Sequence, residues 1–186
     1  MIDVVVKISW SYEIFSALFE NKDPNCESLE IKARKAHPEF FLAMNDSLLC
    51  GLCNGVALLF KRKEKETSIY SLIKRVEESK PDLAKKLREQ IQLHHNLVEK
   101  IRGIRNEFCA HRNKFKTPPQ VFSEVQLHLN ELKTVVKLAR HVVCILAEQS
   151  GKCKRELLET QQLSKETLQC VANDAHLVMK AFVKPC

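Results

Sequence analysis

Apolar residues recur at alternating intervals of three and four positions near the middle of the C-terminal half. They are Phe122, Val125, Leu129, Leu132, Val136, Ala139, Val143 and Leu146. This spacing puts every member on one face of an α-helix, and that face must be covered by other helices. The repeat therefore predicts a helix in a bundle, starting at Pro118-Pro119 and ending at Ser150-Gly151.

A second long helix is predicted from Pro38 to Phe60. It is apolar around most of its circumference, so we expect it to be central in the fold. Gly51 and Gly55 lie one turn apart and would let a neighbouring helix approach closely. Polar residues within the segment, among them Asn54, favour a buried helix over a membrane span.

A third long helix is predicted to begin at Pro81 and to continue to Phe108. Its apolar stripe consists of Leu83, Leu87, Ile91, His94, Val98 and Ile101. Shorter helices are predicted over residues 3–20, over 69–76 with Thr67 or Ser68 as the cap, and after Ser164. The run Val4-Val5-Val6 is β-branched, so a strand remains an alternative to a helix for the first of these segments.

With only 4 Gly and 6 Pro, the chain has few residues for the many reversals of a β-sandwich. We therefore predict an all-α, up-and-down bundle of about five to seven helices. Residues 1–150 are expected to form the bundle, and residues 151–186 a helical extension that packs on the same domain.

The net charge of +7 favours polyanionic partners through long-range attraction and counterion release. No secretion signal is visible, so the 8 cysteines are expected to be reduced thiols of a cytoplasmic protein that is not in a membrane. Cys50-Gly51-Leu52-Cys53 lacks a second pair and a neighbouring His, so packing is the better interpretation than a metal or redox site. We expect no metal and no cofactor.

Arg105 is an anomaly, because it lies at the margin of the surface that the third long helix should bury. An unpaired buried charge is costly, so its guanidinium must meet a carboxylate, a carbonyl or a phosphate, or lie at an opening. Asn106 follows directly, and His111 closes the segment. Together these residues suit metal-independent RNA cleavage, with His as acid/base, Arg as the phosphate clamp and Asn as a group that orients the phosphate or the imidazole.

Arg105 and His111 are six positions apart, so on a continuous α-helix they would point roughly 120° apart. One helix cannot easily bring both to one phosphate. Either the helix ends before His111, or two copies of the motif face each other across a dimer.

The segment IRNEFCAHRN resembles the signature of the HEPN (higher eukaryotes and prokaryotes nucleotide-binding) family, in which Arg precedes His by four to six intervening residues. Here five intervene, Asn106 to Ala110. The upstream segment FFLAMNDSLLCGLCNGVALLFKRKEKETSIYSLIKRVEE is similar to the abortive-infection type U branch, with a long apolar helix, basic residues and a short helix. The similarity covers roughly residues 38–146.

The resemblance implies a helical domain that dimerises and pairs two motifs in a cleft, as an endoribonuclease of phage defence or of a toxin–antitoxin system. Arg105, Asn106 and His111 carry over as its catalytic residues. The residues that follow, Arg112, Asn113 and Lys114, are expected to contact RNA, although the charges of Arg112 and Lys114 also fit a solvated loop. An antitoxin or nucleotidyltransferase partner is implied too, but relatives modified by that route have Tyr where this chain has Asn113.

Two other functions stay open. A non-catalytic HEPN module would bind a nucleotide, RNA or a protein partner with the same bundle and dimer. A purely structural helical adaptor would use Arg105 in an intramolecular salt bridge.

Overall fold

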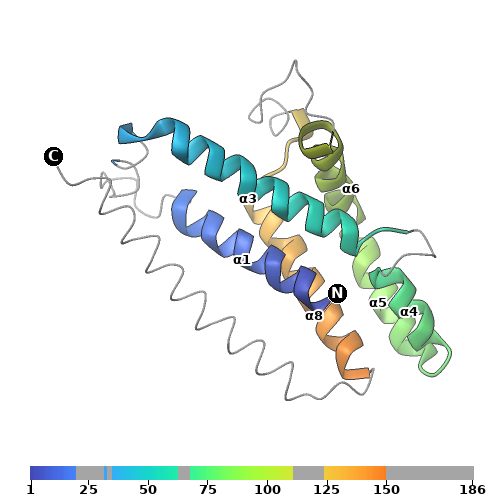
Figure 1. Cartoon of the computed structure of the whole chain (residues 1–186). Coiled ribbons are helices and arrows are strands. Elements are labelled where there is room, and N and C mark those ends of the chain that lie inside the picture. The colour runs from blue at the N-terminus through green and yellow to red at the C-terminus, as the bar shows by residue number, and fades with distance from the viewer. Residues whose placement is uncertain (20–31, 33–34, 63–67, 111–123, 150–186) are drawn as a thin grey trace.

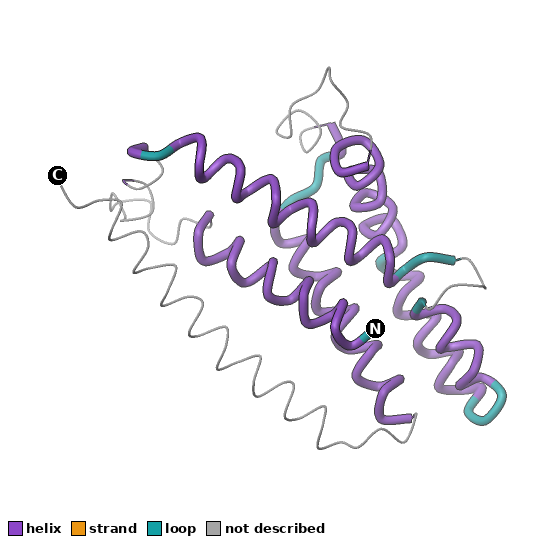
Figure 2. Tube along the Cα trace, in the orientation of Figure 1, coloured by secondary structure: helices purple, strands orange, loops and turns teal. Residues whose placement is uncertain are grey.

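The computed structural model describes residues 1–19, 32, 35–62, 68–110 and 124–149. This part of the chain contains six α-helices, one π-helical turn and no strand, which confirms the predicted all-α class (Figure 2). The elements are α1 (Ile2–Phe19), α3 (Pro38–Leu59), α4 (Ile69–Glu77), α5 (Pro81–Leu93), α6 (His95–Ile104), η1 (Arg105–Ala110) and α8 (Leu129–Gln149). The extension predicted over 151–186 lies outside the described residues.

The helices α1 and α3 lie side by side and run in opposite directions (Figure 1). The helix α8 contacts α1, α3, α4 and α6, so the repeat that predicted a bundle helix does belong to a helix with several partners. The helices α4 and α5 pack against each other at one end of the molecule, and α6 lies against α3. The strand alternative for Val4-Val5-Val6 is wrong, because α1 is helical from Ile2.

One apolar core connects the described helices. Its fully buried side chains include Leu52 and Val56 of α3, Ile69 and Ile73 of α4, Ile101 and Ile104 of α6, and Val135, Ala139 and Val142 of α8. Each buried side chain of this size contributes about 1.5–3 kcal/mol relative to an exposed one. The three- and four-residue spacing in the sequence therefore identifies most of the core.

The predicted close approach occurs at Gly55. A Cβ atom at this position would overlap Cγ2 of Ile8, so α1 packs directly on the backbone of α3 there. At Gly51 a Cβ atom would meet Oγ of Ser11 at 3.7 Å, which is ordinary van der Waals contact. Only Gly55 is thus needed for the approach of the two helices.

The start of α4 confirms Ser68 as its N-cap. The Ser68 hydroxyl accepts from the backbone N–H of Ser71 at 3.3 Å, and the Ser71 hydroxyl accepts from the backbone N–H of Ser68 at 2.9 Å. This reciprocal pair is a capping box, which satisfies two N–H groups that the first helical turn leaves without partners.

The helix predicted from Pro81 to Phe108 is not continuous. The helix α5 ends at Leu93, His94 leaves helical geometry with φ −108° and ψ 14°, and α6 begins at His95. The tight turn at His94 keeps the apolar register, because Ile91 before it and Val98 after it are both buried. Apolar periodicity therefore could not reveal the break.

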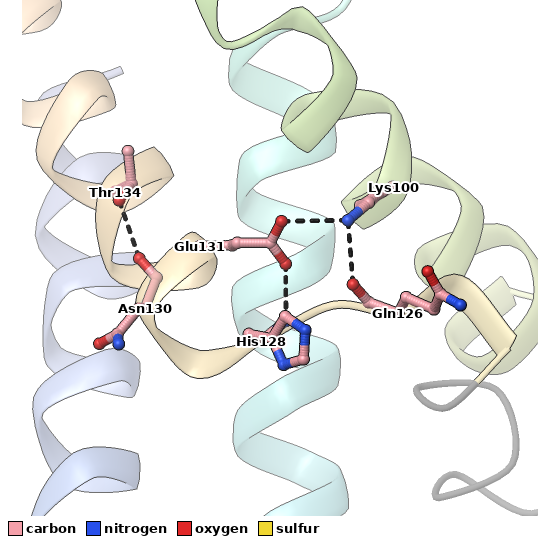
Figure 3. A network of polar contacts seen from close by, with 6 residues as sticks. All are labelled: Lys100, Gln126, His128, Asn130, Glu131 and Thr134. Carbon is pink, nitrogen blue, oxygen red and sulfur yellow. Dashed lines mark hydrogen bonds and ion pairs between the residues drawn. The ribbon is translucent and has the colours of Figure 1, made fainter.

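The helix predicted from Pro118-Pro119 to Ser150-Gly151 is not continuous either: residues 124 and 125 are helical, but α8 begins only at Leu129. The predicted start at Pro118-Pro119 lies outside the described residues. Gln126 interrupts the helical path with a φ of 51°, a left-handed conformation that is uncommon for a residue with a side chain. Lys100 of α6 holds this turn, since its Nζ donates to the Gln126 carbonyl at 2.9 Å (Figure 3).

The expectation that α3 is buried on most sides needs correction. Phe40, Leu42 and Leu58 are 47%, 54% and 54% exposed, so α3 packs along one side and leaves large apolar side chains outside the described core. By length and composition alone, α3 is also the one helix of the described ranges that could cross a membrane. A core helix passes the same test, and Leu52, Cys53 and Val56 of α3 are fully buried.

Candidate functional site

The helix α6 carries the chain to the Arg105 motif. Its residues Val98, Ile101 and Ile104 are buried in the core and fix the helix against its neighbours. Arg105 follows Ile104 directly and is the first residue of η1. Because Ile104 is fully buried, the position of Arg105 is fixed at the edge of the core.

Arg105 is half-buried, and its guanidinium has two hydrogen-bond partners among the described residues. Its Nε donates to Oδ1 of Asn54 on α3 at 3.3 Å, and its Nη1 donates to Oδ1 of Asn106 at 2.9 Å. The first bond crosses from η1 to α3, which are in contact along this edge. Arg105 is thereby held in one direction by two side chains from different elements.

Both partners of Arg105 are neutral amides. Among the described residues, no carboxylate forms an ion pair with Arg105 within 4.0 Å. An arginine is always charged, and amide oxygens do not cancel its charge. The described part of the chain therefore presents an oriented positive charge at the edge of the core, without the salt bridge that a structural adaptor would need there.

The motif begins in a π-helical turn, Arg105–Ala110. A π-helix bonds residues five apart instead of four, so it is wider than an α-helix, and such turns are frequent at functional sites. The offset of roughly 120° expected for Arg105 and His111 assumed a continuous α-helix. That assumption is wrong for this segment.

The structure brings together only part of the predicted site. Asn106 is exposed, and its amide oxygen accepts from the Arg105 guanidinium. Its expected role, to orient the phosphate or the imidazole, stays a prediction. The other predicted residues, His111, Arg112, Asn113 and Lys114, lie outside the described residues. Their roles stay predictions.

Sequence reasoning missed Asn54. Asn54 is one of the polar residues that argue against a membrane span, but this pattern does not indicate a partner. Its partner Arg105 is 51 positions away in the sequence. A local pattern cannot reveal a contact at that separation. The signal available was a half-buried amide within a largely apolar helix, since such a group needs a hydrogen-bond partner.

A second polar group lies on α6 and next to the end of α3. Nη1 of Arg102 lies 2.7 Å from Oε1 of Glu99, which is 3.9 Å from Nδ1 of His95. Nη2 of Arg62, which follows α3, lies 3.3 Å from the same His95 nitrogen, and the Arg62 guanidinium stacks on Tyr70 at 5.9 Å. This group is predominantly basic, as is the site beside it.

The Cys50–Cys53 pair fits packing. Cys53 is fully buried and Cys50 is half-buried on α3. Within the described ranges, no group of three or more His, Cys, Asp or Glu side chains is placed to hold a metal ion.

No known protein family, no curated protein and no solved structure matches the chain.

Proposed function

We propose that the protein is a metal-independent endoribonuclease of the HEPN class. The observation that carries the proposal is the half-buried Arg105, oriented by the amides of Asn54 and Asn106 and without a carboxylate partner among the described residues. A guanidinium in this state suits the non-bridging oxygens of a phosphodiester, which it can bind through two parallel N–H donors.

In the proposed reaction, the imidazole of His111 takes the proton of a ribose 2′-hydroxyl. The 2′-oxygen attacks the adjacent phosphorus, the bond from phosphorus to the 5′-oxygen breaks, and water supplies that oxygen with a proton. The His111 imidazolium then releases its own proton to solvent, which restores the starting state. Arg105 stabilises the additional negative charge of the transition state. The products are a 2′,3′-cyclic phosphate and a 5′-hydroxyl, and Arg112, Asn113 and Lys114 contact the RNA on either side.

The proposed site forms at a cleft between two copies of the chain. Each copy contributes an Arg105 held against its own α3, and pairing the motifs brings two positive charges to one RNA strand. We propose further that the homodimer acts in the cytoplasm, in phage defence or in a toxin–antitoxin system. An antitoxin or a nucleotidyltransferase would be its partner there.

The test is RNA cleavage in EDTA by purified wild type and by His111→Ala. We expect cleavage by the wild type, loss of cleavage in His111→Ala and equal melting temperatures. His141→Ala is the matched control, because His141 is exposed on α8 and distant in sequence from the motif. Cleavage that survives in His111→Ala would rule out the proposed chemistry.

The second candidate is a non-catalytic HEPN module that binds a nucleotide, RNA or a protein partner. It is favoured by one observation: the two described partners of Arg105 hold its guanidinium as an anion-binding group, and neither is an acid or a base. This module would bind RNA without turnover, and His111→Ala would leave binding unchanged.

A further inference from the structure

Asn54 lies at a position where the backbone of α3 is held firmly by its neighbours. It lies on α3 between Cys53, which is fully buried, and Gly55, which packs directly against Ile8 of α1. The backbone of α3 at this position cannot shift without breaking the contact between α1 and α3. The side-chain amide of Asn54 is therefore a fixed point for Arg105.

Within the described ranges, the contact also leaves part of the guanidinium available. Asn54 accepts from Nε, and Asn106 accepts one of the hydrogens on Nη1. The remaining N–H donors, on Nη1 and Nη2, form the end of the fork, which can bind two oxygens of one phosphate. Fixing Nε sets the direction in which this end points.

The neutrality of Asn54 matters as much as its position. An aspartate there would have nearly the same size and would also accept from Nε, but it would compensate the charge of Arg105. A carboxylate bound to the guanidinium competes with a phosphate for the same charge, so it would remove much of the attraction for that phosphate.

We infer that Asn54 is a positioning residue, which directs the Arg105 guanidinium toward an RNA phosphate and leaves its charge uncompensated. The inference rests on the proposed function for its ligand, an RNA phosphodiester. The geometry of the inference depends only on the contact between Asn54 and Arg105.

Binding of a fluorescent, 2′-O-methylated single-stranded RNA tests the inference, since this probe cannot be cleaved through its 2′-oxygen. Asn54→Asp should weaken binding by about tenfold or more, and Asn54→Ala by less, because alanine removes the orientation but not the charge. A purely structural role for Asn54 predicts the reverse order, since aspartate keeps the hydrogen bond. That reverse order would overturn the inference.

Asn96→Asp is the matched control, with the same chemical change at an exposed position in the first turn of α6. It should bind the probe within about twofold of the wild type, because an exposed charge at a distance is largely screened. A loss as large as that of Asn54→Asp would show that net charge alone decides binding, and it would also overturn the inference.

The exchange rate of the Arg105 Nε proton, measured by NMR without RNA, separates the two proposals. We expect slow exchange in the wild type and faster exchange in Asn54→Ala, with the signal assigned by its loss in Arg105→Lys. Equal exchange in both proteins would refute the contact itself. A protected Nε in a wild type that neither binds nor cleaves RNA would refute the proposed function and leave the contact standing.

Discussion

Nζ of Lys100 lies 3.0 Å from Oε1 of Glu131, and this ion pair ties α6 to the first turn of α8. The other carboxylate oxygen of Glu131 accepts from the backbone N–H of His128, directly before α8, at 2.7 Å (Figure 3). An acidic side chain that bonds back to the N-cap position is half of a capping box, and it also suits the positive end of the helix dipole. Glu131 therefore helps to fix the start of α8 at Leu129.

Two replacements of Glu131 should destabilise the fold to different extents. Glu131→Ala loses both bonds and should lower the free energy of unfolding by about 1–2 kcal/mol. Glu131→Gln keeps an amide oxygen for the His128 N–H, so it should cost less. Urea denaturation of both variants measures the difference, and equal losses would show that the bond to His128 contributes nothing.

The stability that Glu131 contributes should depend on pH, because its pKa is lowered in the folded protein. Hydrogen bonding from the His128 backbone N–H, followed by the contact with Lys100, lowers this pKa below its usual range. A carboxyl whose pKa is lower in the folded state contributes stability above its unfolded pKa, about 4.3, and loses it as the pH falls through the folded value. The stability difference between wild type and Glu131→Gln should therefore shrink on acidification below about pH 4. A difference that grows there would contradict this assignment.

Substitution by alanine should have opposite effects on stability at Gly55 and at Gly103. Gly55→Ala places a Cβ into Ile8, so it should destabilise the protein, by about 1–3 kcal/mol for an overpacked core. Gly103→Ala meets nothing within 4 Å and lies in α6, so it should stabilise by about 0.5–1 kcal/mol through helix propensity. Thermal or urea unfolding measures both.

Gly51→Ala is the control for the first of these, because it lies one turn before Gly55 on the same helix and has only ordinary contact with Ser11. It should be tolerated. If Gly51→Ala and Gly55→Ala cost the same, the close packing of α1 on α3 would be wrong.

The salt dependence of RNA binding reports whether Arg105 contacts a phosphate. In Arg105→Gln, the slope of log Kd against log salt should fall by about 0.7, the value for one lost phosphate contact on a single strand. Arg105→Lys should keep most of the slope but bind more weakly, since an ammonium group lacks the fork. Arg75→Gln, at an exposed position of α4, is the charge-matched control. The same change of slope in Arg75→Gln would show only a loss of general charge.

Mixed dimers test whether the site is shared between two chains. When Arg105→Ala and His111→Ala chains are co-expressed, a site built from Arg105 of one chain and His111 of the other regains one intact copy. RNA cleavage should then return in the mixture, although each variant alone is inactive. A mixture that contains mixed dimers and stays inactive would show that both residues act within one chain.

Local periodicity predicted the helices that bury a continuous stripe, and α3 and α8 end within a residue or two of their expected C-terminal ends. The break at His94 was hidden because the turn preserves the stripe. The start of α8 was hidden because it depends on Lys100, which lies 31 positions before Glu131. The contact between Lys100 and Glu131 joins two helices that are distant in the sequence, and a local spacing rule cannot predict it.

In the candidate site, too, the local sequence pattern predicted one part and missed another. The position of Arg105 beside the stripe of Val98 and Ile101 predicted a guanidinium at the edge of the core, where it does lie half-buried. The π-helical turn and the bond to Asn54 could not be predicted, because both depend on how η1 packs against α3.

The chemical ends of the RNA products test the proposed ribonuclease most directly. Mass spectrometry of RNA incubated with the wild type in EDTA should find 2′,3′-cyclic phosphates and 5′-hydroxyls, with DNA of the same sequence left intact. Arg105→Ala and His111→Ala should give no such products. Uncut RNA at stoichiometric enzyme, or the same products from either variant, would contradict cleavage by the Arg105–His111 motif.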